Sequence, residues 1–199
     1  MVHLNERVSI PIKRIAGCIL LALWAGCAIQ RNQTAATVPA EGAITSGYAL
    51  LFDLLKDEKD VSKLLVIKRE RPELRTLIKE IAEAAGRAHK QLEAFAKADR
   101  SLNLNSQGLP AAEVETRAAI AQAKGKELLT EGGKQFELRL LLSQNEALTY
   151  AAHLTGTIVK TESNATRAGY LRQLAGELHG LQGKVTAMLL VNYNWPATK

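Results

Sequence analysis

The stretch LRQLAGELHGLQGKVTAM, residues 171–188, decides the fold class. Its apolar residues recur at alternating spacings of three and four, which places them on one side of a helix and is typical of a packed helical seam. The members of this stripe are Leu171, Leu174, Leu178, Leu181, Val185 and Met188. The pattern therefore predicts a long helix over 165–191 with one buried side.

A helical apolar period also runs through the preceding 120 or so residues, about three-fifths of the chain. Pro72 is well placed in the first turn of a helix, while Gly132 and Gly133 break one. We expect further helices from Thr45 or Ser46 to about Glu70, from Pro72 to a break at 101–110, over 111–129 and over 134–160. Four long helices with one long connection that carries its own helix predict an all-α, four-helix bundle domain at 44–191.

Two segments carry a resemblance to a known family. They are KQFELRLLLSQNEALTYAAHL (134–154), which follows a break, and LRQLAGELHGLQGKV (171–185) in the closing helix. With the helix order, they resemble a family of uncharacterised exported bacterial proteins with a ferritin-like fold, over about 51–190. The resemblance implies a ferritin-like four-helix bundle with a helix in the crossover connection, and it implies no activity.

The first 26 residues have the layout of an export signal. Basic residues, among them Lys13 and Arg14, precede a short apolar run over 15–24, and Ala25 and Gly26 follow. The run is far shorter than the ~20 residues that a membrane-spanning helix needs. The segment 1–26 is therefore predicted to be a signal peptide.

The residues before Cys27 resemble the lipobox of bacterial lipoproteins, with Trp24 in place of the usual leucine. This resemblance implies that Cys27 is acylated and anchors the protein to a membrane. Ala28 after the cysteine implies the outer membrane, with the domain facing the periplasm; the alternative is a soluble periplasmic protein with Cys27 unmodified. We expect a flexible tether at 27–43 and an irregular tail at 192–199.

Composition and motifs exclude several function classes. The net charge is +6, but basic and acidic residues are mixed and aromatic residues make up 5%, so no nucleic-acid surface is predicted. Di-iron bundles use Glu-x-x-His pairs, and the chain has none. It also lacks a phosphate-binding glycine loop and a Gly-x-Ser-x-Gly motif. No metal, cofactor or catalytic residue is predicted.

Polar residues inside the apolar stripes are the candidate site. Glu58 and Asn145 occupy stripe positions, and His89 lies at the edge of a stripe. We expect Glu58 and Asn145 to pair with each other, with water or with a lysine and to set the register of the bundle, because a buried polar group needs partners; alternatively, the three residues form a small polar pocket. His153 and His179 are expected on the outside, roughly 10 Å apart along the bundle and unable to share one ion without a rearrangement.

Glycine recurs on the closing helix, opposite its apolar stripe. The residues are Gly169, Gly176, Gly180 and Gly183. Each lowers helix stability by up to ~1 kcal/mol relative to alanine, so we expect the connecting helix or a partner protein to dock there; the alternative is a merely exposed face.

These patterns favour a non-enzymatic envelope lipoprotein with an interaction or structural role. Its expected partners are the membrane, through the N-terminal lipid, and an envelope protein. The alternative is a ferritin-like metal-binding or redox protein with a divergent site.

Overall fold

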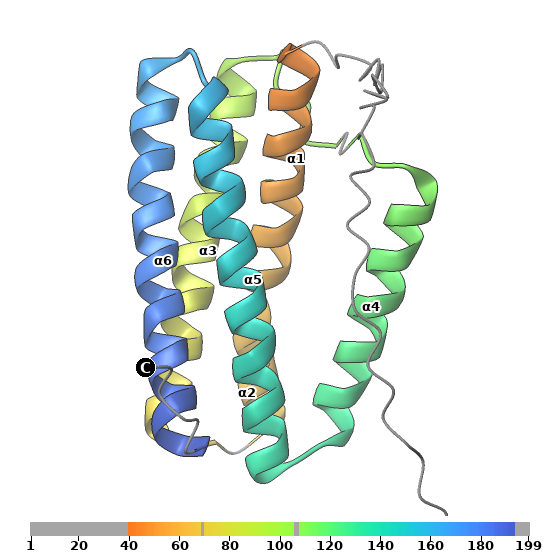
Figure 1. Cartoon of the computed structure of the whole chain (residues 1–199), viewed down its shortest axis with the longest axis vertical. Coiled ribbons are helices and arrows are strands. Elements are labelled where there is room, and N and C mark those ends of the chain that lie inside the picture. The colour runs from red at the N-terminus through yellow and green to blue at the C-terminus, as the bar shows by residue number, and fades with distance from the viewer. Residues whose placement is uncertain (1–39, 69, 106–107, 194–199) are drawn as a thin grey trace, which may run out of the picture. The chain divides into compact units, whose positions relative to one another are not determined.

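A computed structural model describes residues 40–68, 70–105 and 108–193, and this part of the chain is helical apart from its turns and connections (Figure 1). The elements in chain order are α1 (Ala40–Glu58), the short 3-10 helix η1 (Val61–Lys63), α2 (Leu64–Ile67), α3 (Pro72–Ala98), α4 (Ala111–Thr130), α5 (Gly133–Thr161) and α6 (Ala165–Tyr193). The all-α class is confirmed. The signal peptide, Cys27 and most of the tether lie outside the described residues.

The first predicted helix is the one that differs most from expectation. It begins at Ala40, inside the predicted tether, and is interrupted after Glu58 instead of running to Glu70. At the interruption the N–H of Asp60 bonds the carbonyl of Asp57 (3.1 Å) in a tighter turn, and η1 follows. Aspartate, valine and serine in succession at 60–62 are weak helix formers, which explains the break.

The last helix extends beyond its predicted end. α6 continues to Tyr193, into the predicted irregular tail. The Tyr193 hydroxyl donates to the carbonyl of Lys134 (3.1 Å), and Arg71 donates to the side-chain oxygen of Asn192 (3.1 Å). These contacts fix the final turn against the starts of α5 and α3, which an apolar pattern does not reveal.

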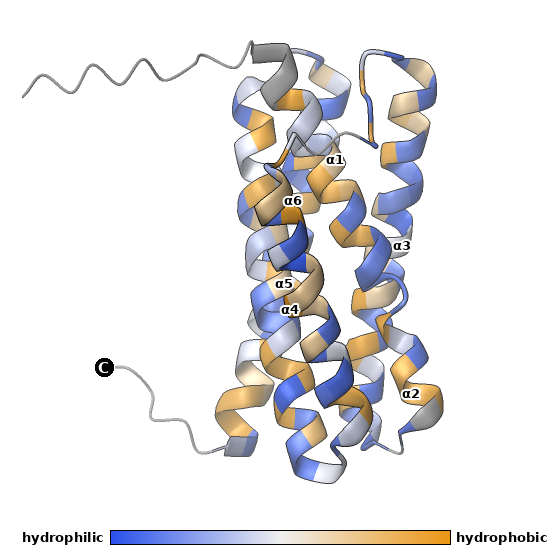
Figure 2. Ribbon diagram, turned by 90° about the vertical axis from the view of Figure 1, so that its right-hand side faces the viewer, coloured by the Kyte–Doolittle hydropathy of each residue, from blue (hydrophilic) through white to orange (hydrophobic). Residues whose placement is uncertain are grey.

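Four long helices share one hydrophobic core. α1 packs against α3 and α5, and α6 packs against α3 and, most extensively, α5. Figure 2 shows hydrophobic and hydrophilic residues mixed along every helix, as expected for helices that bury one side. The stripe that decides the fold class supplies buried residues at Leu171, Leu174, Leu178, Leu181 and Val185.

Helix α4 stands apart from this core. Leu128 is its one buried residue, whereas Val114, Ile120 and Leu129 are about half exposed. Its packing partner is α5 (Figure 1). The expected docking of the connecting helix on the glycines of α6 is therefore wrong, because the connection brings α4 down beside α5.

Candidate functional site: the groove beneath helix α4

A groove separates α4 from the end of α1, η1, α2 and α5. Its volume is about 570 Å³. Ile120, Ala121 and Leu128 of α4 face Val61, Leu64 and Leu140 across it. Ala121 and Gly125 are small, and a Cβ added at Gly125 would meet nothing within 4 Å, so α4 leaves open space at these two positions. The groove therefore has largely apolar walls and is open to solvent, and Arg117, Lys124 and Ser143 also line it.

Two polar side chains lie in this groove without satisfying all their polar atoms. Glu58 is the last residue of α1, and Gln144 of α5 hydrogen-bonds its carboxyl group. The second carboxyl oxygen, Oε2, and the Gln144 oxygen Oε1 are both buried and have no hydrogen-bond partner among the described residues. Both atoms are acceptors when Glu58 is ionised. The groove thus contains two buried acceptors that require a donor.

The carboxyl group of Glu58 changes its protonation state near neutral pH. Burial raises its pKa to about 7, and the nearby charge of Asp57 adds to the rise while the hydrogen bond from Gln144 opposes it. A protonated Glu58 can donate its O–H toward the Gln144 oxygen, so that one proton supplies the missing donor. A cation that displaces this proton would supply the same donors.

The charge around Glu58 favours such a cation. Asp57 and Asp60 lie beside it at the groove, where the carbonyl end of α1 adds partial negative charge. Burial, followed by the charge of Asp53, raises the pKa of Asp57. Asp60 forms an exposed ion pair with Lys63 (2.8 Å).

The basic residues on the α4 side of the groove have other partners. The Arg117 Nε donates to Glu113 (2.7 Å), and its guanidinium lies over the Tyr150 ring at 5.6 Å. Lys124 pairs with Glu146 of α5. Neither Glu113 nor Glu146 lines the groove. Arg117 and Lys124 thus line the groove themselves, but each is paired with a carboxylate outside it.

The three residues predicted as a polar pocket have separate surroundings. Glu58 lines the groove, whereas Asn145 faces α6, where its side-chain oxygen accepts from Gln182 (2.8 Å) and Thr186 (3.1 Å). Glu58 meets Gln144 instead of Asn145, because successive helical residues point about 100° apart. Gln144 could have been identified as a candidate partner of Glu58 because it lies one residue before Asn145, which occupies a stripe position.

His89 is not at the groove. Its ring stacks on Phe52 with the centroids 4.1 Å apart, and its Nδ1 lies 4.0 Å from Glu93. It lies at the edge of a stripe, as the sequence indicates, and is buried; burial together with the charge of Lys59 lowers its pKa. It serves as part of the α1–α3 packing.

The glycine face of α6 is open. A Cβ added at Gly169, Gly176, Gly180 or Gly183 would meet nothing within 4 Å. Nothing within the described part of the chain packs closely against these glycines, and docking of a partner protein stays a prediction.

His153 and His179 are neighbours, contrary to expectation. Their ring centroids are 5.5 Å apart. The estimate from residue counts was wrong because helical side chains tilt toward the helix N-terminus. In the antiparallel pair α5 and α6 this tilt brings the two side chains toward each other.

Two further polar clusters were not identified from the sequence, and both join helices. Arg71, just before α3, forms a two-pronged ion pair with Glu137 of α5, a buried residue. Arg167 of α6 contacts Glu162 (2.9 Å) and Asp99 (2.7 Å), and the Tyr48 hydroxyl donates to Glu162 (2.5 Å). Their partners are complete, so we assign them to stability.

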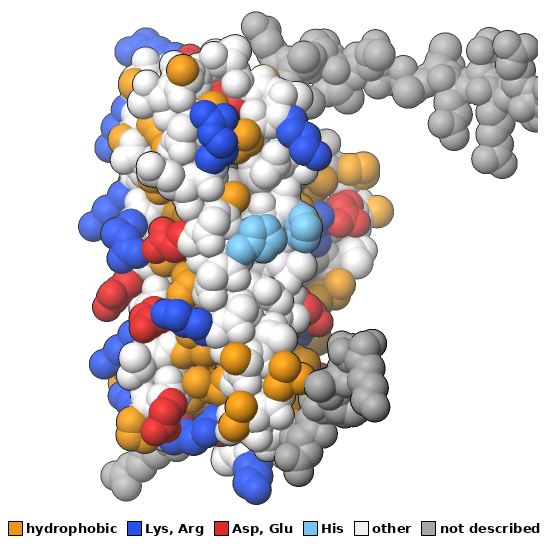
Figure 3. Space-filling view, turned by 60° about the vertical axis from the view of Figure 1, so that its left-hand side comes forward, with side chains coloured by type: hydrophobic (Ala, Val, Ile, Leu, Met, Phe, Trp, Pro, Cys, Tyr) orange, Lys and Arg blue, Asp and Glu red, His pale blue; other side chains and the backbone are white. Residues whose placement is uncertain are grey.

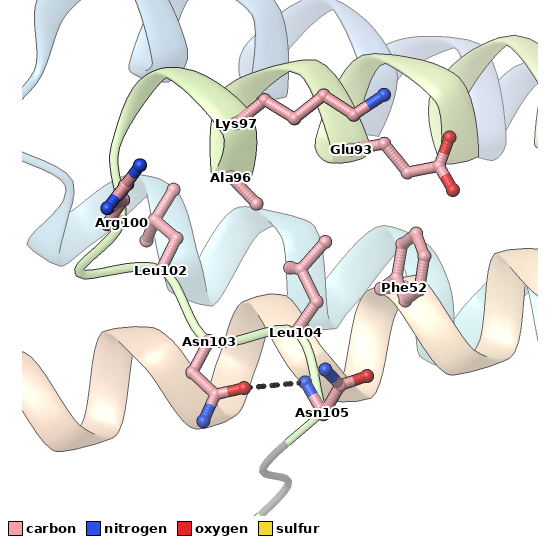
Figure 4. Close-up of a pocket in the computed structure, with 9 residues that line it drawn as sticks. All are labelled: Phe52, Glu93, Ala96, Lys97, Arg100, Leu102, Asn103, Leu104 and Asn105. Carbon is pink, nitrogen blue, oxygen red and sulfur yellow. Dashed lines mark hydrogen bonds between the residues drawn. The ribbon is translucent and has the colours of Figure 1, made fainter.

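A second hollow, of about 510 Å³, lies at the other end of α1 (Figure 4). Leu102, Leu104 and Phe52 line it together with Glu93 and Lys97. The side-chain oxygen of Asn103 accepts from the N–H of Asn105 (3.0 Å). None of its described lining residues has a buried side-chain atom without a hydrogen-bond partner. Unlike the groove, this hollow therefore has no unsatisfied buried acceptor.

Comparison with protein-family models, curated proteins and solved structures gives no match to this chain. None of the helices in the described part of the chain combines the length and apolar character needed to cross a membrane. Within the same residues, no group of three or more His, Cys, Asp or Glu side chains is placed to hold a metal ion.

Proposed function

We propose that this protein is an exported, non-enzymatic binding protein whose groove beneath α4 holds a small organic cation. The ligand carries an ammonium group on an apolar body. The observation that carries the proposal is the pair of buried acceptors, Glu58 Oε2 and Gln144 Oε1, which have no hydrogen-bond partner among the described residues and lie in a largely apolar groove. An ammonium has three donors and no acceptor, and its alkyl body fits the apolar walls.

The proposal includes the location and architecture that the sequence predicts. Cys27 is acylated, and the domain is held at the outer membrane facing the periplasm by the tether that follows. The four long helices form a ferritin-like bundle. Support for the bundle comes from the packing of α1 and α6 against both α3 and α5, with α4 in the crossover. Mass spectrometry of the mature N-terminus tests the anchor: the mass of an acylated Cys27 is expected, and an unmodified cysteine would contradict it.

The ligand class is tested by calorimetric titration with three probes of equal chain length: hexylammonium, hexanol and hexanoate. Hexylammonium should bind most tightly and hexanoate least. The matched variant Glu58→Gln keeps the shape of the side chain and removes its charge. It should weaken hexylammonium binding by about tenfold or more, corresponding to about 1.4 kcal/mol, and leave hexanol binding unchanged.

The pH dependence supplies an independent readout. Hexylammonium requires ionised Glu58, so its affinity should rise as the pH increases through about 7. Exposed Glu83→Gln serves as the control and should behave as the unmodified protein does. Equal affinity for hexanol and hexylammonium, or no effect of Glu58→Gln, would overturn the proposed ligand class.

A further inference from the structure

Two histidines form a pair on the outer surface of the bundle. His153 of α5 and His179 of α6 are both exposed, with ring centroids 5.5 Å apart and ring planes at 88° (Figure 3). They belong to different helices, and the groove beneath α4 involves neither of them. The pair is therefore a feature of its own.

The helices that carry the pair are held in a fixed register. α5 and α6 share the most extensive packing in the described part of the chain, and a short turn over 162–164 joins them. Asn145 of α5 accepts hydrogen bonds from Gln182 and Thr186 of α6, which pins the two helices lengthwise. The backbone positions of the two histidines are thus set before any ligand arrives.

Glycines border the pair on both helices. Gly176 and Gly183 lie three residues before and four after His179, on the same side of α6. Gly156 lies three residues after His153, on the same side of α5. A Cβ at any of these glycines would meet nothing within 4 Å. The imidazole rings can therefore turn, and water can reach the space between them.

The spacing suits a shared metal ion. With a metal–nitrogen distance of about 2.1 Å and about 1.2 Å from nitrogen to ring centre, two imidazoles at a tetrahedral angle have centres about 5.4 Å apart. The observed 5.5 Å agrees with this value. Imidazole is a preferred ligand of Ni²⁺, Cu²⁺ and Zn²⁺.

We propose that His153 and His179 together bind one divalent transition-metal ion, with water in its remaining coordination positions. The two imidazole rings reach the ion by rotation about their side-chain torsion angles, while the helices stay in place. The open glycine surface leaves the outer positions of the ion accessible. This site is independent of the ligand groove.

The test is a titration with Ni²⁺ alone, measured by calorimetry on protein without a polyhistidine tag and with its cysteines alkylated. The unmodified protein should bind one ion per chain at this site. His153→Gln and His179→Gln should each weaken binding by about tenfold or more, because each removes one of two ligands. The double variant measures binding by the rest of the chain, and exposed Gln173→Ala is the matched control.

Electron paramagnetic resonance of the Cu²⁺ complex provides a direct count of ligands. Two imidazole nitrogens are expected in the unmodified protein and one in each single variant. Both histidines are exposed, so the variants should keep the far-UV circular dichroism of the parent. Equal Ni²⁺ affinity in the unmodified protein and the single variants, or one nitrogen in the unmodified Cu²⁺ complex, would overturn the proposal.

Discussion

The buried carboxyl group of Glu58 should make stability depend on pH in a defined window. Its ordinary pKa of 4.5 rises to about 7 in the folded protein, with burial as the main cause. Between these two values the folded state holds the proton more tightly than the unfolded state does. The free energy of unfolding therefore falls as the pH rises from about 4.5 to about 7 and levels off above that range.

The size of this effect follows from the two pKa values. Each pKa unit corresponds to about 1.4 kcal/mol, so ionisation of Glu58 should destabilise the fold by about 3 kcal/mol. Glu58→Gln removes the titration, and its amide can donate toward the Gln144 oxygen. We expect the variant and the unmodified protein to have similar stability near pH 4.5, and the variant to be about 3 kcal/mol more stable above pH 7.

Urea denaturation followed by circular dichroism, repeated from about pH 4.5 to about pH 8, measures this difference. Exposed Glu83→Gln is the control and should run parallel to the unmodified protein throughout. A constant difference between Glu58→Gln and the unmodified protein across the range would refute the argument, because it would mean that folding does not perturb this carboxyl group.

Three further substitutions test the packing, each by the urea midpoint. Arg167→Ala should cost about 2–4 kcal/mol, because it leaves the buried Glu162 carboxylate without its two-pronged partner. Hydrogen bonds outweigh burial and lower the pKa of Glu162. The stability that this cluster provides should therefore be lost as the pH falls below 4.5. A destabilisation by Arg167→Ala that does not change with pH would contradict this reasoning. Gly176→Ala should stabilise by about 0.5–1 kcal/mol, since its Cβ meets open space; destabilisation would show that the face is packed. Gly47→Ala should destabilise, because its Cβ would lie 2.9 Å from the Cγ1 of Ile158, and a gain in stability would show that this contact yields easily.

The sequence patterns predicted the long helices well where one apolar stripe faces one core. The alternating spacing over 171–188 placed α6 correctly, and Pro72 marked the start of α3. The interruption after Glu58 was missed because it depends on local turn hydrogen bonds rather than on periodicity. The position of α4 was missed because its half-exposed apolar residues fit several neighbours equally well.

The side chains of the candidate site were also only partly predictable from the sequence. The apolar stripe identified Glu58 as a polar residue on the buried side of its helix, and this residue lines the groove with its Oε2 atom buried. Its partner was assigned to Asn145 instead of Gln144, since a one-residue difference on a helix turns a side chain by about 100°. The contact between His153 and His179 depends on the direction in which side chains tilt, which residue counting along the axis omits.

The central claim is that the groove beneath α4 binds an organic cation through Glu58 and Gln144. The most direct measurement is a titration of the ¹⁵N-labelled protein with hexylammonium, followed by nuclear magnetic resonance. The account predicts shifts concentrated in the backbone amide signals of Glu58, Gln144 and Leu128 and in the side-chain amide of Gln144, and their loss in Glu58→Gln. Shifts centred on the other hollow, near Asn103, or an unchanged pattern in Glu58→Gln would contradict it.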